Sequence, residues 1–381
     1  MHILVLGCGV IGKGTVRQFV KYSDADVSVA DIDVEKAEET VQSLTDQQIP
    51  ARQVDVSDTV NLRQTIEAVE PDVVANTIGP FYKFADNVYQ ACLDTGIDCV
   101  DVCDDIKGAR AALSYHEDAQ DAGISIVNGA GDSPGLTNII AKYGAMQLDN
   151  VESIDIYWIA PQSDIGRAQL YHAVNMFAHP RIYRNGSLTE VTGTVTVEFE
   201  PPLGRIEMAF TDHPEVYTLP KYFDGLTQVR NAGALYPKLP VAGEEIGRLY
   251  RRITDEIGET GQSETVEDTV VKLLNQTREG KLEVWDEQDV EYEIGGTKIE
   301  IQGLEGGERS EYVFSSIGRG MSGTPRTLMT VTKMVANGMV APGSYAPEGC
   351  IDPEEFIREF SGGGLTLAQT PQSYRLSIVE N

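Results

Sequence analysis

The first part of the chain alternates short apolar runs with amphipathic stretches. His2 to Leu6 is apolar over a length that suits a buried parallel strand, and Lys13 to Tyr22 places its apolar residues on one helical face. A second apolar run, Val27 to Ala30, ends on the acid Asp31. The pattern therefore predicts a strand, a glycine-containing turn, a helix and a second strand in this order.

The same alternation continues to about residue 148. Further strands are predicted at Ala51 to Val54, Asp72 to Asn76, Ile97 to Val102 and Ile124 to Asn128. Helices are predicted at Val34 to Leu44, Thr59 to Val69, Phe84 to Thr95, Lys107 to Ala122 and Gly135 to Met146. Strands and helices that alternate with short connections form right-handed parallel crossovers. We expect an α/β fold with a Rossmann-type doubly wound parallel sheet, whose ligands bind at the carboxyl ends of the strands.

The pattern changes near Asp149, where strand-like stretches follow one another. They are Ser153 to Ala160, Gly193 to Glu200, Arg205 to Thr211, Glu291 to Ile294, Lys298 to Gln302 and Ser310 to Ile317. Gly295-Gly296 and Gly306-Gly307 are typical of hairpin turns, and helices are predicted at Glu244 to Ile257 and Ser263 to Arg278. This section predicts an α+β domain with a mostly antiparallel sheet.

Two helices are predicted after Met321, at Thr324 to Asn337 and Pro353 to Phe360. They are too short to form a core by themselves, so we expect them to pack onto the first domain. The expected organisation is a discontinuous dinucleotide-binding domain, residues 1–148 and 321–381, and a domain for substrate binding and dimerisation, residues 149–320.

The turn after the first strand has the sequence Gly7-Cys8-Gly9-Val10-Ile11-Gly12. In a strand–turn–helix context this spacing is the dinucleotide fingerprint, in which Gly7 permits the tight turn, Gly9 lets the backbone approach a pyrophosphate and Gly12 brings helix and strand together. Asp31 lies nineteen residues after Gly12, where a carboxylate can bind a ribose diol and repel a 2′-phosphate. We therefore predict NAD as the cofactor.

Other predicted cofactor contacts follow the third and fourth strands. Asp55-Val56 comes where a strand end lies near the adenine, and Phe81, in the run Thr77-Ile78-Gly79-Pro80-Phe81, is expected to wall the nicotinamide; that run is otherwise merely a turn. The full predicted set is Gly7, Gly9, Val10, Ile11, Gly12, Asp31, Ile32, Asp55, Val56, Thr77, Gly79, Pro80 and Phe81.

Three carboxylates follow the fifth strand in Asp101-Val102-Cys103-Asp104-Asp105. They are able to hold a cationic amine or accept a proton, and we select Asp101 and Asp104 as candidate catalytic residues. The alternative is that Asp104 or Asp105 only caps the next helix.

A glycine-rich loop, residues 129–138, enters the next helix and is expected to leave free N–H groups that suit a carboxylate; it also suits an interdomain hinge. Among basic residues of the middle section we select two arginines as anion clamps, although single basic residues are usually solvated. Predicted substrate contacts are Cys103, Gly131, Asp132, Ser133, Gly135, Arg181 and Arg230. His172 and His179 are seven residues apart without a third ligand, so no metal is predicted.

Charge and cysteine content exclude some classes of partner. The chain has 59 Asp and Glu against 30 Lys and Arg, a net charge of -29, which disfavours nucleic acid and anionic membranes because both are polyanions. The acids are spread along the chain, as on an ordinary solvated surface or in adaptation to high salt. No apolar run spans a membrane, no signal peptide is recognised, and the five cysteines form no CxxC pair. We expect a reduced, cytoplasmic protein.

Several motifs together resemble the saccharopine dehydrogenase-like family. They are the glycine turn 7–12, Asn76 to Phe81, Ile97 to Asp101, Gly131 to Asn138 and, near the end, Asn337 to Gly343 with Pro347-Glu348-Gly349 and Pro353 to Phe356. Over Gln162 to Gly307 only the general layout is similar. Where lysine-directed members have a Thr-Leu-Arg-Tyr type segment, this chain has Thr218-Leu219-Pro220-Lys221-Tyr222.

The resemblance implies NAD(P)-dependent hydride transfer at a carbon–nitrogen bond of an amino acid or amine, by a homodimer. Lysine 6-dehydrogenase-like deamination is the first hypothesis, because length and layout resemble lysine 6-dehydrogenases. The alternatives are reductive condensation of the saccharopine or carboxynorspermidine dehydrogenase type, and a dinucleotide-binding protein without catalysis.

Overall fold

The structure is a computed structural model that describes residues 1–44, 49–161, 167–236, 250, 268, 271, 294–319, 323–360, 365–370 and 373–378. The chain divides into two compact units. The first unit comprises Met1–Met146, Ser322–Thr366 and Val379–Asn381, and the second comprises Gln147–Met321 and Leu367–Ile378. Residues 367–378 therefore group with the second unit, whereas the sequence pattern assigned everything after residue 320 to the first domain.

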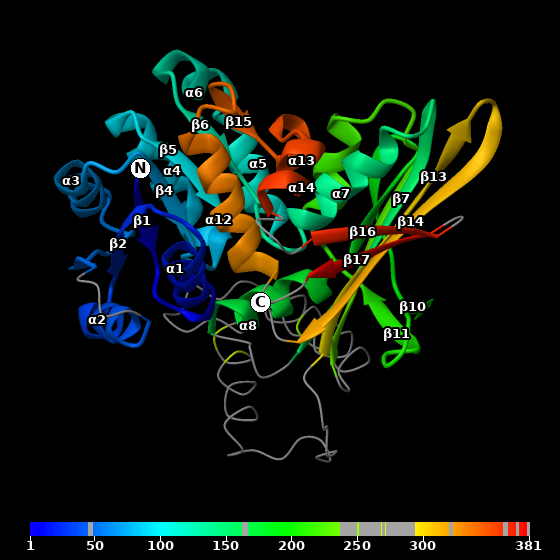
Figure 1. Ribbon diagram of the computed structural model, residues 1–381, viewed down its shortest axis with the longest axis horizontal. Helices are drawn as coiled ribbons and strands as arrows, with labels where there is room; N and C mark the ends of the chain where they lie inside the picture. The colour runs from blue at the N-terminus through cyan, green and yellow to red at the C-terminus, as the bar shows by residue number, and fades with distance from the viewer. Residues whose placement is uncertain are drawn as a thin grey trace. The chain divides into compact units, whose positions relative to one another are not determined.

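The first unit contains a seven-stranded sheet in which every strand pair is parallel (Figure 1). Its strands are β1 (His2–Leu6), β2 (Asp26–Asp31), β3 (Ala51–Gln53), β4 (Val73–Asn76), β5 (Asp98–Asp101), β6 (Ser125–Val127) and β15 (Gly343–Tyr345). Their order is β15-β6-β5-β4-β1-β2-β3, which confirms the predicted Rossmann-type sheet. The seventh strand, β15, was not predicted, because its pairing partner β6 is distant in the chain.

Helices cover this sheet on both faces (Figure 1), and its central strands are buried along most of their length, whereas the edge strand β3 is partly exposed. In β1, the side chains from Ile3 to Leu6 have no exposed surface, as expected for a parallel strand packed on both sides. The helices before the second unit are α1 (Val10–Tyr22), α2 (Val34–Gln42), α3 (Thr59–Val69), α4 (Phe81–Thr95), α5 (Ile106–Ser114), α6 (His116–Ala122) and α7 (Leu136–Ala145). The single helix predicted for Lys107 to Ala122 is thus two helices, which meet at Tyr115.

The chain returns to the first unit with α12 (Gly323–Ala336), α13 (Pro347–Cys350) and α14 (Pro353–Phe360). Helix α12 packs against α1, β4 and β5, and α14 packs against α7 and α12 (Figure 1). A Cβ on Gly14 of α1 would lie 2.7 Å from Pro325 Cγ, so a glycine permits this close helix contact. The buried Arg326 donates a hydrogen bond to the Phe360 carbonyl. The late helices therefore complete the core of the first unit.

The second unit is built on a ten-stranded mixed sheet. Its strands are β7 (Asn150–Pro161), β8 (Arg181–Arg184), β9 (Ser187–Glu190), β10 (Thr194–Glu198), β11 (Arg205–Phe210), β12 (Gln228–Tyr236), β13 (Ile294–Glu305), β14 (Glu308–Arg319), β16 (Leu365–Thr370) and β17 (Ser373–Ile378). The main path is β10-β11-β12-β7-β13-β14-β17-β16, with the hairpin of β8 and β9 attached to β12. Most pairs are antiparallel, but β12 runs parallel to β7 and β17 parallel to β14.

Two glycine pairs of the second unit behave differently. Gly306 and Gly307 form the predicted hairpin turn between β13 and β14, and both have positive φ. The hairpin predicted at Gly295-Gly296 is wrong, because both residues lie inside β13. A Cβ on Gly296 would lie 2.8 Å from the Ser316 carbonyl oxygen of β14, so this glycine serves the close approach of two strands.

Other elements of the second unit were missed or lie outside the described residues. The sequence pattern missed β8, β9, β12, β16, β17, α8 (Arg167–Ala178) and α9 (Glu215–Thr218). The helices predicted at Glu244 to Ile257 and Ser263 to Arg278 and the strand beginning at Glu291 lie mostly outside the described residues. Within the described part, one core of this unit joins Tyr157 and Ile159 of β7 to Met208 of β11 and Ala232 of β12.

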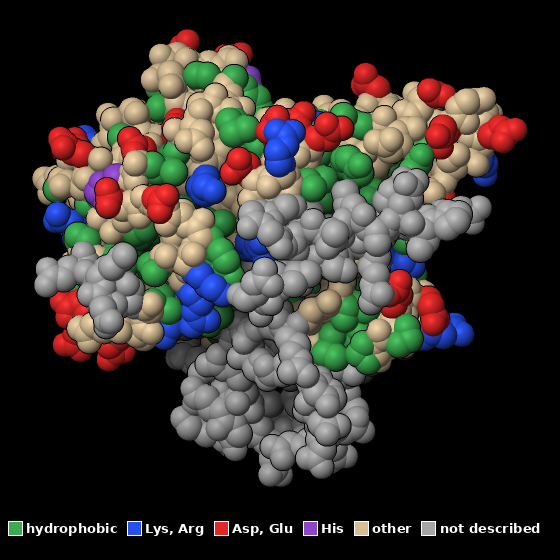
Figure 2. Space-filling view, viewed as in Figure 1, with side chains coloured by type: hydrophobic (Ala, Val, Ile, Leu, Met, Phe, Trp, Pro, Cys, Tyr) green, Lys and Arg blue, Asp and Glu red, His purple; other side chains and the backbone are tan. Residues whose placement is uncertain are grey.

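Acidic side chains are scattered over the visible surface and do not gather in one patch (Figure 2). This distribution agrees with the even spread of Asp and Glu along the chain. In the described part of the chain, no helix is both long enough and apolar enough to cross a membrane.

Candidate active site

The glycine turn of the first unit joins β1 to α1. Gly7 has a φ of 93°, a left-handed conformation that glycine adopts without steric cost. A Cβ on Gly12 would lie 1.8 Å from the Gly7 carbonyl oxygen, so only glycine lets α1 begin this close to β1. The Thr77 hydroxyl lies 2.8 Å from the Leu6 carbonyl oxygen and 3.2 Å from that of Gly7. Thr77, at the end of β4, therefore holds the turn.

Gly9 differs from the other two glycines of the turn. Its φ is -72°, and a Cβ built on it has no atom within 4 Å, so neither conformation nor packing within the described chain requires glycine there. Gly9 is also the N-cap of the thirteen-residue helix α1 and offers no side chain to cap it. Open space at a helix N-terminus is what a pyrophosphate requires, and these residues therefore fit a dinucleotide.

The Asp31 carboxylate lies at the end of β2 and holds backbone around it. It accepts hydrogen bonds from the Cys8 N–H (2.6 Å) and the Asp33 N–H (3.0 Å). Its side chain is 8% exposed, whereas the neighbouring Ile32 is 61% exposed and Val10 is 46% exposed. A carboxylate has about four lone-pair positions, so Asp31 has the capacity to accept a ribose hydroxyl in addition to tying the glycine turn to β2.

The loop after β3 contains the predicted adenine contacts. Asp55 Oδ1 accepts hydrogen bonds from the Ser57 N–H (2.9 Å) and the Ser57 hydroxyl (2.6 Å), and these bonds lower the pKa of Asp55. The Val56 side chain is buried, and its carbonyl accepts from Asn87. Asp58 is the N-cap of α3, and its side chain accepts hydrogen bonds from the N–H groups of Val60 and Asn61.

Phe81, predicted to wall the nicotinamide, begins α4 and is 7% exposed. A Cβ on Gly108 of α5 would lie 3.5 Å from Phe81 Cβ, which shows that Phe81 packs between the two helices. Gly79 and Pro80 are partly exposed. The accessible part of this loop is therefore Gly79-Pro80 together with Thr77, while the Phe81 ring is mostly occupied by packing.

Asp101 ends β5 and has no exposed surface. Its carboxylate accepts hydrogen bonds from the Tyr89 hydroxyl (2.6 Å), the Cys103 N–H (2.8 Å), the Gly129 N–H (2.9 Å) and the Asn128 amide (3.1 Å). Burial raises the pKa of Asp101, and the four hydrogen bonds oppose that rise. Such contacts make Asp101 an anchor that joins the loops after β5 and β6, and its role in catalysis stays a prediction.

The remaining members of the acidic loop take different positions. Asp105 is the N-cap of α5: its carboxylate accepts from the Gly108 N–H (3.2 Å) and also from the Tyr82 N–H of α4 (3.2 Å). Burial, and next the charge of Asp104, raise the pKa of Asp105 to about 7. Asp104 is partly exposed, whereas Cys103, a predicted substrate contact, is completely buried with its thiol against the Asp105 carbonyl. The capping alternative is therefore correct for Asp105.

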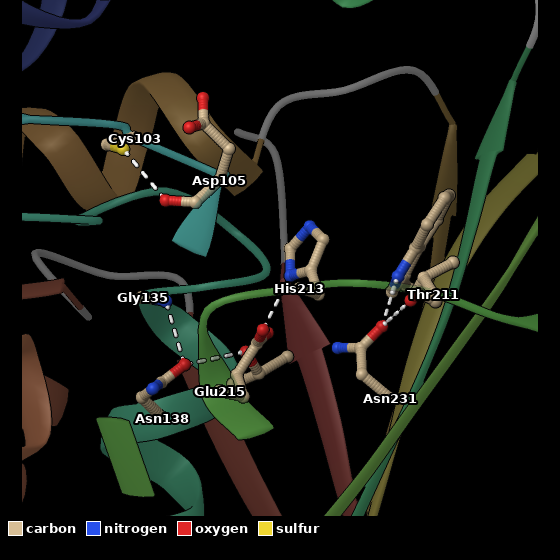
Figure 3. Close-up of polar contacts among 10 residues, drawn as sticks. Cys103, Asp105, Gly135, Asn138, Thr211, His213, Glu215 and Asn231 are labelled. Atoms are coloured by element: carbon tan, nitrogen blue, oxygen red, sulfur yellow. Dashed lines mark hydrogen bonds and ion pairs between the residues drawn. The ribbon is translucent and has the colours of Figure 1, made fainter. Parts of the chain in front are cut away.

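The glycine-rich loop before α7 does not expose the N–H groups that the sequence suggested. The Leu136 N–H donates to the Gly131 carbonyl and the Thr137 N–H to the Asp132 carbonyl, both at 2.9 Å. Gly135 donates its N–H to the Asn138 side chain (3.1 Å; Figure 3). The loop folds back on its own helix, and these three N–H groups already have acceptors. They are therefore not available to a substrate carboxylate.

Two loop residues nevertheless remain partly exposed, Asp132 and Ser133. Burial of its carboxyl raises the pKa of Asp132 to about 6.

Both predicted anion clamps of the second unit are paired with acids. Arg181 forms two hydrogen bonds of 2.6 Å with Asp212, and Arg230 forms two with Asp155, one of them 2.7 Å long. These partners raise the pKa of each guanidinium. Paired with a carboxylate in a bidentate arrangement, neither arginine offers an uncompensated charge to a substrate anion.

One titratable pair in the second unit was not predicted from the sequence. His213 Nδ1 and Glu215 Oε2 are 2.5 Å apart, and the side chains are 3% and 0% exposed (Figure 3). His172 packs edge-on against the His213 ring, with centroids 5.4 Å apart, whereas the exposed His179 lies beside Glu190. A His-Pro-Glu run directly after a strand was the available signal in the sequence.

The first unit matches a known family. Residues 3–127 match the family model described as the saccharopine dehydrogenase NADP binding domain. Carboxynorspermidine synthase of Vibrio cholerae is 28% identical over 180 residues, which cover 41% of this chain and 42% of that protein. Carboxyaminopropylagmatine dehydrogenase of Synechocystis is 24% identical over 165 residues, 40% of each chain. The matched stretch therefore spans well under half of these curated relatives.

A solved structure extends the likeness in fold. Saccharopine dehydrogenase (L-Glu forming) from Saccharomyces cerevisiae has a TM-score of 0.66 over 94% of this chain and 96% of that one, at 15% identity. The resemblance drawn from the sequence motifs is thus confirmed, as is the predicted fold. The family match supports a nicotinamide dinucleotide as the cofactor of the first unit.

Proposed function

We propose that this protein is a nicotinamide dinucleotide-dependent oxidoreductase that acts on a carbon–nitrogen bond of an amine or amino acid. The observation that carries the proposal is the glycine turn, in which Gly7 and Gly12 are required by the fold and Gly9 leaves open space at the N-terminus of α1. It lies in a domain that matches the saccharopine dehydrogenase family model. When bound, the dinucleotide supplies or accepts a hydride.

Reductive condensation is the chemistry that we place first. A primary amine and a carbonyl compound would join with loss of water, and reduction of the resulting imine would give a secondary amine. The names of two relatives, carboxynorspermidine synthase and carboxyaminopropylagmatine dehydrogenase, favour this reaction over deamination of lysine. The segment Thr218–Tyr222 departs from the lysine-directed pattern, which also favours condensation over deamination of lysine.

Residues of the first unit divide between cofactor binding and proton transfer. The glycine turn, Asp31 and the exposed Ile32 would hold the dinucleotide. Asp104, which is partly exposed, remains our candidate for proton transfer at the carboxyl edge of the sheet, whereas the contacts of Asp101 assign it to holding the loops.

We place NAD before NADP because of Asp31. A carboxylate at the end of β2 accepts ribose hydroxyls and repels a 2′-phosphate, and Asp31 is fixed there by two backbone N–H groups. The matched family model is named for NADP, so the two dinucleotides need to be compared directly.

The test follows the absorbance of reduced nicotinamide in both directions. In the reductive direction, lysine and linear diamines are each combined with a 2-oxo acid or a carboxylated aldehyde, and consumption of NADH is expected for at least one pair. In the oxidative direction, formation of NADH from lysine and NAD alone would instead support lysine deamination as the reaction. Calorimetric binding of a dinucleotide without turnover of any pair would contradict the enzymatic proposal and favour a binding protein.

A further inference from the structure

His213, in the loop between β11 and α9, and Glu215, the first residue of α9, form a buried acid–base pair. The imidazole Nδ1 and the carboxylate Oε2 are 2.5 Å apart, and both side chains are almost completely buried. Figure 3 shows the ring and the carboxylate facing each other. None of the roles described above uses this pair.

Stability does not account for such a pair. Removing two charged groups from water costs several kcal/mol each, so a buried ion pair is often no more stabilising than apolar residues of similar volume. Buried titratable groups with a defined partner are more frequent at functional sites. The pair therefore calls for a task in proton transfer.

The loop around the pair is fixed on both sides. The Thr211 N–H and hydroxyl both bond to Asn231, whose side-chain oxygen also accepts from the Trp158 indole (Figure 3). Asp212 is held by Arg181 and donates its N–H to the Met176 carbonyl. With both preceding residues held, the His213 ring has a defined position, as a proton-transfer group requires.

A second imidazole packs against the pair. The ring of His172, on α8, lies edge-on against His213, and Trp158 of β7 lies 6.1 Å away on centroids. His172 is partly exposed, and burial of its ring, followed by the charge of His213, lowers the pKa of His172 well below its usual value.

We propose that His213 is the proton-transfer residue of the second unit for the substrate amine, and that Glu215 is the residue that positions it. This inference rests on the proposed function. Because Glu215 occupies Nδ1, the ring exchanges its proton at Nε2, in the same division of labour as any imidazole oriented by a carboxylate.

The proton follows a balanced path in the condensation. A substrate ammonium N–H bond breaks and an imidazole N–H bond forms, which frees the nitrogen lone pair. The lone pair forms a C–N bond with the carbonyl carbon while the C–O π bond breaks, and a second proton of the nitrogen passes to the oxygen to give the hydroxyl of the adduct. The imidazolium then returns the proton to the hydroxyl of the adduct, the C–O bond breaks, and water leaves with formation of the imine. No electrons are exchanged in these steps, so they can be followed without the dinucleotide.

The experiment compares His213→Gln, Glu215→Gln and Glu215→Asp with His179→Gln as a matched control. His179 is in the same unit but is exposed and lies 3.8 Å from Glu190, so the control makes the same chemical change outside the pair. Dinucleotide binding and the far-ultraviolet spectrum of each full-length variant establish that both units are folded.

The first readout is exchange of the carbonyl oxygen with labelled water, with amine present and no dinucleotide. We expect His213→Gln to lower the exchange rate and kcat by about 10²-fold or more. Glu215→Gln should lower both rates less and change the acid limb of the pH profile, Glu215→Asp should recover part of the rate, and His179→Gln should match the wild type. Folded His213→Gln and Glu215→Gln variants with wild-type rates and pH profiles would overturn the proposal.

A second readout is independent of turnover. Isotope-labelled histidine NMR resolves the five histidines of the chain, and the His213 imidazole should keep its proton to higher pH in the wild type than in Glu215→Gln. Equal titration in the two proteins would contradict the positioning role. If the wild type itself is inactive with every amine and carbonyl pair, the proposed function fails and this inference fails with it, whereas active wild type with equally active variants refutes only the inference.

Discussion

The glycine-turn edge of the first unit and the Thr211–Glu215 loop of the second unit bind or position groups by different means. At the first, the backbone carries the site: Gly7 and Gly12 set the turn, Gly9 leaves space, and carboxylates such as Asp31 hold N–H groups. At the second, side chains carry it, through the contacts of His213 with Glu215 and of Thr211 with Asn231.

Two carboxylates without exposed surface illustrate the difference. Asp101 is bonded to four donors, none of which is a cation, so protonation or removal of its charge disrupts several contacts at once. Glu215 is bonded to an imidazole that can itself take up or release a proton. The same degree of burial therefore gives an anchor in one region and a proton-transfer pair in the other.

Asp101→Asn should have the largest effect on stability. Its amide group cannot accept from the donors that now share the carboxylate, so at least one buried hydrogen bond is lost, at a cost of about 3 kcal/mol. Glu215→Gln should cost less, because a neutral His213 can still donate to the amide oxygen. Denaturant unfolding of both variants measures the contrast, and equal losses would remove the distinction between anchor and pair.

Alanine at two positions of the glycine turn separates folding from binding. Gly12→Ala forces a Cβ against the Gly7 carbonyl, so we expect a loss of about 2 kcal/mol in unfolding free energy. Gly9→Ala places its Cβ in open space and should leave the melting temperature nearly unchanged while weakening dinucleotide binding about tenfold. Calorimetry and thermal melting test the pair of variants; undiminished binding by Gly9→Ala would argue against the pyrophosphate site.

Asp31→Ala should weaken NAD binding by about tenfold, equivalent to about 1.4 kcal/mol. The Cys8 and Asp33 N–H groups lose their acceptor, so NADP affinity is also expected to suffer from a looser turn. Loss of the negative charge also removes its repulsion of the NADP 2′-phosphate, which offsets the weaker binding caused by the looser turn. The difference in affinity between NAD and NADP should therefore become smaller. The measurement is the dissociation constant of each dinucleotide for the wild type and the variant. An unaltered ratio of the NAD and NADP constants would count against a role of Asp31 in discriminating between the two dinucleotides.

A pH dependence of about 1 kcal/mol is expected from Asp105. Its folded-state pKa of about 7 exceeds the ordinary value of 3.8, so the stability contributed by the protonated form is complete below the ordinary value and is lost as pH rises through about 7. Between about pH 6 and pH 7 the wild type should lose about 1 kcal/mol relative to Asp105→Ser, which retains a capping side chain. Parallel stability curves of the two proteins across this interval would show that Asp105 is ionised throughout.

The sequence was most informative where structure depends on neighbours along the chain. The alternation of apolar runs and amphipathic helices predicted six of the seven parallel strands, and the spacing of Gly7, Gly9, Gly12 and Asp31 predicted the glycine turn. Strand β15 was missed because its three residues pair with a strand far away in the chain. In the second unit, the parallel pairing of β12 with β7 and the position of Gly296 inside a strand depend on such distant contacts too.

Side-chain roles were harder to predict than elements. Three acids in one loop look alike in the sequence, yet Asp101 is an anchor, Asp105 is a helix cap and Asp104 is partly exposed. The acidic partners of the two arginines selected as anion clamps could not be predicted from the sequence, because only the fold brings Asp212 and Asp155 next to them. The homodimer and the cytoplasmic location stay predictions.

The most direct measurement of the central claim is the destination of the hydride. The full-length protein is incubated with an amine, a carbonyl compound and dinucleotide deuterated at the transferable position, and the product is examined by mass spectrometry and NMR. One deuterium is expected on the carbon bonded to the new amine nitrogen. Deuterium on a carbon bonded to oxygen, as in simple reduction of the carbonyl compound, would contradict it.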